Sequence, residues 1–155
     1  MKELKKILLN LSIGEFAAVC VFIYIYILLN LINLGRANLI AFLYLVVILL
    51  QGSIYWFYKY LLMGKRKKSG LKAKKFLSFL RLLNAIVLIL IMIIILIIKN
   101  NGKDLLIAIG LFLFGVIEYV NYYWYRLSYG KSGFNIKILL SRKLQKSTIN
   151  KLISN

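Results

Sequence analysis

The chain has 155 residues, of which 62% are hydrophobic, and its 22 Lys and Arg against 4 Asp and Glu give a formal net charge of +18. A soluble domain has about 45–50% apolar residues, and a chain with a larger share lacks the polar side chains to cover its surface. The composition also excludes a disulfide-stapled domain, because Cys20 is the only cysteine, and the absence of histidine excludes zinc sites and His-based catalysis. A membrane protein accommodates both the apolar and the basic excess.

Four apolar runs are each close to the roughly 20 residues that cross about 30 Å of hydrocarbon as a helix. They cover residues 13–34, 39–57, 82–98 and 105–125, and only a few residues separate the first from the second and the third from the fourth. We therefore predict an all-α integral membrane bundle of four transmembrane helices, arranged as two helical hairpins. Residues 1–128 would form this domain, with a basic loop over 59–81, and residues 129–155 a basic cytoplasmic or membrane-surface tail.

The first run follows a basic start, which is also the pattern of a secretory signal peptide. It continues past the core of about 7 to 15 apolar residues that such peptides have, and no small-residue cleavage site follows it. We expect a retained membrane anchor. Within it, Cys20 is expected to be a small buried apolar residue.

The cations are concentrated on one side of the predicted bundle. All but three of the 22 lie in the N-terminal segment, in the central loop and its flanks, or in the tail, and the exceptions are Arg36, Lys99 and Lys103. Lys and Arg are retained on the cytoplasmic side of a membrane. We therefore predict a multi-pass protein of the cell membrane with both termini and the central loop in the cytoplasm.

Part of this basic charge directly flanks the predicted spans. A cation near an anionic leaflet contributes about 1 kcal/mol of attraction. We expect contact with anionic lipid of the inner leaflet through Lys65, Arg66, Lys67, Lys68, Lys74, Lys75 and Arg126.

The tail has two short stretches of helical apolar pattern rather than one continuous face. We predict two short interfacial helices with a break near Lys146, and Ser147 as the N-cap of the second. Nucleic-acid binding would require only this charge and pattern, which membrane-surface helices share, so we expect no nucleic-acid partner.

Polar residues inside the predicted spans are costly in hydrocarbon and are therefore informative. Counted from the outer ends at 1.5 Å per residue, Gln51, Asn84 and Glu118 share a depth of roughly 20–23 Å, and Glu15 lies somewhat nearer the cytoplasmic boundary. Two more polar residues follow Glu118 by three and four positions and extend its helix face. The predicted intramembrane polar layer consists of Glu118, Glu15, Gln51, Asn84, Asn121 and Tyr122.

A carboxylate at this depth must be protonated, paired or hydrated. In one hypothesis Glu118, with Glu15 and Gln51 nearby, forms a cytoplasm-facing site for a proton or a cationic ligand. In the other, Glu118 bonds to Gln51 and Asn84 and joins the helices, at about 1 kcal/mol per bond. The residues alone leave both hypotheses open.

Sequence patterns of catalysis are absent. The chain has no paired-carboxylate motif, no metal-ligand cluster, no phosphate-binding glycine loop and no Ser–His or Cys–His pair. We therefore expect no catalytic residue, metal or cofactor. We expect instead a non-enzymatic accessory, partner-binding or immunity-type protein that contacts anionic lipid, with a membrane protein or a second copy of the chain as its partner. The alternative is a small transporter or channel that uses Glu118 and Glu15 as a proton or cation site.

Cysteine labelling tests the predicted orientation. In a Cys20→Ala background, the Asn101→Cys variant should react with a membrane-impermeant maleimide added to intact cells, because residue 101 lies between spans on the outer side. The Ser69→Cys variant should react only after lysis. Labelling of the Ser69→Cys variant in intact cells would contradict the predicted topology.

Overall fold

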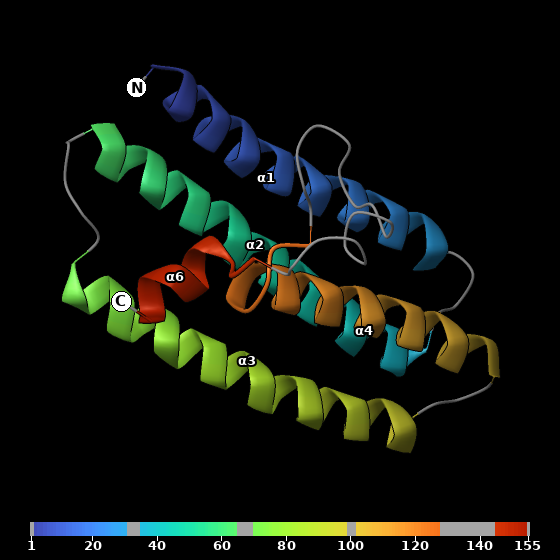
Figure 1. The fold of residues 1–155 in the computed structure, drawn as a ribbon. Coiled ribbons are helices and arrows are strands. Elements are labelled where there is room, and N and C mark those ends of the chain that lie inside the picture. The colour runs from blue at the N-terminus through green and yellow to red at the C-terminus, as the bar shows by residue number, and fades with distance from the viewer. Residues whose placement is uncertain (1, 31–34, 65–69, 99–101, 128–144, 155) are drawn as a thin grey trace.

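The computed structural model describes residues 2–30, 35–64, 70–98, 102–127 and 145–154 (Figure 1). Within these ranges the chain is all-α. The helices are α1 (Lys2–Asn30), α2 (Arg36–Gly64), α3 (Leu71–Ile98), α4 (Gly102–Tyr123) and α6 (Thr148–Ser154). The first four are long and apolar enough to cross a membrane, which supports the prediction of a small multi-pass membrane protein with four spanning helices.

The helices extend beyond the predicted spans at one end of the bundle. This end, where α1 and α3 begin and α2 and α4 end, is called the basic end below, and it is the end predicted to face the cytoplasm. Residues 59–64 and 71–81 are helical, so the prediction of a loop over 59–81 was wrong for these residues. The physical reason is that both segments are rich in Leu and Lys, which are good helix formers, and neither contains proline.

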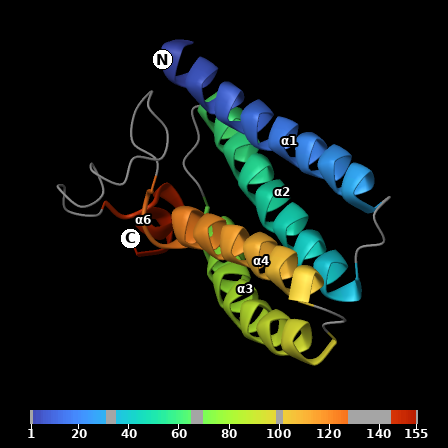
Figure 2. The same ribbon diagram turned by 90° about the vertical axis from the view of Figure 1, so that its right-hand side faces the viewer.

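α2 is the central helix of the bundle. It packs along both α1 and α4, which flank it on opposite sides and make no backbone contact with each other (Figure 2). Four α2 residues at helical spacing, Ala37, Ala41, Leu45 and Ile48, are completely buried. α3 packs against α2 and α4. α1 packs along α2 and touches α4 through side chains, with the Phe22 and Phe114 rings 5.3 Å apart. Cys20, expected to be buried, is exposed on α1, because that helix packs along α2 alone and few of its residues are buried.

Small residues allow close approach between the helices, as is typical of membrane helix packing. Ser12 of α1 and Ser53 of α2 exchange two hydrogen bonds, since each hydroxyl donates to the other residue's carbonyl oxygen at 3.0 Å. Between α2 and α4, a Cβ atom at Gly115 would lie 2.9 Å from the Tyr44 ring. These contacts fix the register of α2 against α1 and α4.

A buried polar pair joins the two hairpins at the end opposite the basic end. The Asn38 amide, near the start of α2, donates to the carbonyl oxygen of Asp104 at 3.2 Å and to its carboxylate. Both side chains are buried. The carboxylate also lies in the space that a Cβ at Gly35 would occupy. Asp104 was not among the residues predicted to be important, although it is one of only 4 acids in the chain.

The end of the tail folds back onto the basic end of the bundle. The Trp124 carbonyl, just after α4, accepts from the Ser147 backbone N–H and from the Asn150 amide, both at 3.0 Å. The Ser147 hydroxyl accepts from the Asn150 backbone N–H at 3.0 Å, which confirms the predicted N-cap. α6 packs against α3 and α4, and its Ile149 belongs to the core. The first of the two predicted tail helices lies outside the described residues.

Candidate functional site

The structure divides the predicted polar layer between two places. One group lies between α2 and α3, and the other lies between α1 and α4. Each group also depends on a residue that was not predicted from the sequence: Tyr123 in the first group and Gly52 in the second.

The first group joins three helices around one amide oxygen. Asn84 of α3 and the Tyr123 hydroxyl of α4 both donate to Gln51 Oε1 of α2, each at 2.8 Å. Asn84 also donates to the Leu80 carbonyl at 2.8 Å. Tyr123 therefore makes the α4 contribution that one hypothesis assigned to Glu118. Tyr123 follows Glu118 by five positions, so the two residues lie about 140° apart around the helix.

The second group places two acids around one hydroxyl. Tyr122 of α4 donates from its hydroxyl to Glu15 Oε2 of α1 at 2.5 Å. Glu118, one turn earlier on α4, lies close enough to this hydroxyl for an electrostatic interaction with it. Asn121 donates to Glu118 Oε2 at 3.4 Å. Because a tyrosine hydroxyl carries one proton, it can donate fully to only one of the two carboxylates at a time.

Gly52 makes room for this contact. A Cβ atom at Gly52 would lie 2.5 Å from Cζ of Tyr122 and 2.7 Å from its hydroxyl oxygen. The tyrosine side chain therefore crosses α2 at a position where that helix has no side chain, and so reaches Glu15. Gly52 was not predicted from the sequence, and the signal that could have found it is a glycine directly after Gln51 inside an apolar helix.

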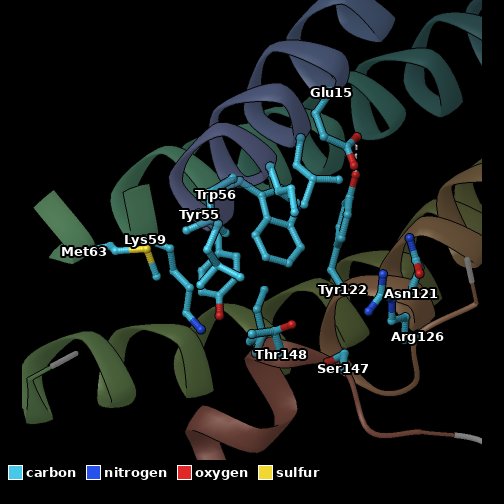
Figure 3. A pocket seen from close by; sticks show the side chains of 15 residues that line it. Glu15, Tyr55, Trp56, Lys59, Met63, Asn121, Tyr122, Arg126, Ser147 and Thr148 are labelled. Atoms are coloured by element: carbon cyan, nitrogen blue, oxygen red, sulfur yellow. Dashed lines mark hydrogen bonds between the residues drawn. The ribbon is translucent and has the colours of Figure 1, made fainter. Parts of the chain in front are cut away.

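A cavity of about 350 Å³ adjoins this group at the basic end (Figure 3). α1 lines it with aliphatic side chains, α2 contributes Tyr55, Trp56 and Lys59, and the end of α4 contributes Asn121 and Tyr122. The segment at the start of α6 closes the remaining side. The α1 residues that line the cavity are Leu4, Ile7, Leu8, Leu11 and Glu15.

The cavity has opposite charges toward its two ends. Glu15 lies about three helical turns farther along α1 than Leu4, so its carboxylate marks the end deeper in the membrane. Lys59 lines the cavity closer to the basic end, where α2 finishes, and Arg126 lies beyond the end of α4. The Lys59 ammonium is 5.7 Å from the centre of the Tyr55 ring, within the range of a cation–π interaction.

The cations predicted to contact anionic lipid are only partly described. Lys74 and Lys75 lie in the first turns of α3, at the basic end. Arg126 lines the cavity. Residues 65–68 lie outside the described residues.

Comparisons with known proteins add no family to this description. No protein-family model, no curated protein and no solved structure matches the chain. The described residues contain no group of three or more His, Cys, Asp and Glu side chains that could hold a metal ion. The polar group at the cavity is therefore the basis for a functional proposal.

Substituting Gly52 tests the crossing of Tyr122 over α2. Gly52→Ala should lower the free energy of unfolding by about 1–3 kcal/mol, because the new methyl group overlaps the Tyr122 ring. Gly110→Ala is the matched control on α4, since no atom lies within 4 Å of its Cβ position. That control should be neutral or stabilising by up to about 1 kcal/mol. Equal unfolding midpoints for the two variants in detergent micelles would contradict the packing.

Proposed function

We propose that this small multi-pass membrane protein is a non-enzymatic binding protein whose cavity takes up a cationic group, in competition with protons, at Glu15 and Glu118. The observation that carries the proposal is the Tyr122 hydroxyl, which lines the cavity and donates to Glu15, another lining residue, with Glu118 one turn earlier on the same helix. The role of Tyr123 supports it as well. Because Tyr123 joins Gln51 and Asn84 to α4, the joining of these helices does not require Glu118.

The chemistry of two neighbouring acids supports a cation or proton site. Two ionised carboxylates are costly side by side in apolar surroundings. A bound ammonium group or a proton relieves that repulsion, and the Tyr122 hydroxyl stabilises the carboxylate that stays ionised. Exchange of a proton for a cationic group is the reaction that such a pair can perform without a metal or a cofactor.

The residues that line the cavity indicate which class of ligand it can bind. Its aliphatic wall on α1 suits an apolar body, and the carboxylate of Glu15 at the deeper end suits an amine. Lys59 lines the opposite end and would hold an anionic group if the ligand carries one. An amphiphilic amine therefore matches the cavity better than a small hydrated metal cation does, because the aliphatic wall offers such an ion no ligands. If the protein also carries the bound amine across the membrane, it acts as the small transporter of the alternative hypothesis.

A specific observation also favours the accessory or immunity-type role as a second candidate. Among the described helices, α1 has close backbone contacts with α2 alone, and large apolar side chains such as Phe16 and Tyr24 are more than half exposed on it. In this second proposal, a membrane protein partner or a second copy of the chain packs on α1.

Octylammonium is a suitable probe of the proposed site, with octanoate as the anion of matched length. Octylammonium should raise the unfolding midpoint of the purified protein in nanodiscs, and octanoate should not. Glu15→Gln and Glu118→Gln should each weaken octylammonium binding about tenfold or more, because a charge-assisted hydrogen bond is lost. Lowering the pH should also weaken binding, because protons compete for the same carboxylates.

Glu3→Gln is the matched control, since it removes the same charge from α1 but lies outside the cavity lining. This control should bind octylammonium as the native protein does. An equal response of all three variants, or no response of the native protein, would overturn the proposal.

A further inference from the structure

A second cavity, of about 510 Å³, lies between α2 and α3. Tyr55 is the one described residue that lines both cavities, so its side chain separates them. The second cavity has no carboxylate among its lining residues, in contrast to the first. It is therefore a different chemical environment, and what it binds does not depend on the function proposed above.

The lining of this second cavity changes with depth. α2 and α3 run in opposite directions, and the end of α2 and the start of α3 both lie at the basic end (Figure 1). Lys72 and Tyr58 line the cavity nearest that end, and Phe76 and Leu80 follow on α3 toward the middle of the membrane. Lys72 and Leu80 are about 12 Å apart along the helix axis. A cation thus lies at the membrane surface and apolar side chains lie below it.

The polar groups that line the cavity can donate hydrogen bonds. The Tyr55 hydroxyl is buried and has no hydrogen-bond partner within the described part of the chain. The Gln51 oxygen already accepts from Asn84 and Tyr123, which leaves the amide NH₂ as its donor group. Together with the Lys72 ammonium, these groups match a ligand that carries negative charge and several acceptor oxygens.

The cavity is open to the hydrocarbon of the bilayer. Ile54 and Phe76, which line it, are 67% and 60% exposed, and both lie on helices that can span the membrane. A ligand can therefore reach the cavity sideways from the lipid. A second copy of the chain would cover these apolar side chains but would provide few carboxylates for Lys72, because the chain has only 4 acids.

We propose that this cavity binds one anionic phospholipid from the leaflet at the basic end. The lipid phosphate pairs with Lys72, the glycerol ester oxygens lie beside Tyr58 and Tyr55, and an acyl chain packs along Phe76 and Leu80. This order of polar and apolar groups is the order of a phospholipid from headgroup to tail. The charge of Lys72 selects an anionic lipid over a zwitterionic one.

Native mass spectrometry of the full chain in a neutral detergent tests the proposal. The probes are phosphatidylglycerol and phosphatidylcholine with the same acyl chains, and inorganic phosphate. We expect one phosphatidylglycerol to bind about fivefold tighter than phosphatidylcholine. Inorganic phosphate should not displace it, because the acyl chain contributes to binding.

Three variants distinguish a specific lipid site in the cavity from non-specific electrostatic attraction between the basic protein and anionic lipid. Lys72→Gln should remove the preference for phosphatidylglycerol, and Ala73→Trp should abolish binding of the first lipid by filling the cavity that Ala73 lines. Lys6→Gln is the matched control, because Lys6 lies near the start of α1 at the same end of the bundle and outside the cavity lining. Retention of the lipid by folded Ala73→Trp would overturn the proposal. An equal loss of preference in Lys72→Gln and Lys6→Gln would also overturn it.

Discussion

The hydrogen bond from Tyr122 to Glu15 is the interaction on which the arrangement of the candidate site depends. α1 and α4 have no backbone contact, and this bond links them across the central helix α2. It requires Gly52, because a side chain at that position would overlap the tyrosine ring. It also places Glu15 at the deeper end of the cavity, with Glu118 one turn before Tyr122 on α4. The crossing of Tyr122 over α2 and the chemistry proposed for the two acids therefore both involve this contact.

Hydrogen bonds between side chains join the helices at several depths. Hydrocarbon offers no partner for a polar group, so each such group inside a span is satisfied by a neighbouring helix or remains costly. Reciprocal serine bonds join α1 to α2, and a shared amide oxygen joins α2, α3 and α4. A buried amide and carboxylate join α2 to α4 at the end opposite the basic end. These contacts give an otherwise uniformly apolar bundle a defined register.

Run length and charge distribution were sufficient to predict the four long helices, and capping chemistry was sufficient to predict Ser147 as an N-cap. Depth counting placed Gln51 and Asn84 at one level, and these two side chains are hydrogen-bonded, but it could not give the rotation of the polar residues about each helix axis. Apart from Asn84, the span over 82–98 is apolar on every side. Its sequence therefore does not indicate which neighbouring helix Asn84 faces. As a result, the partnership of Gln51 and Asn84 with Tyr123 was not foreseen. The docking of α6 depends on the Trp124 carbonyl, a backbone group that no side-chain pattern reveals.

A double-mutant cycle on Glu15→Gln and Tyr122→Phe measures the central contact most directly. The free energy of unfolding in detergent micelles is compared for the native protein, both single variants and the double variant. If the hydroxyl and the carboxylate are bonded across α2, the two substitutions should couple by about 0.5–2 kcal/mol. Additive effects, within about 0.3 kcal/mol, would contradict the bridge between α1 and α4.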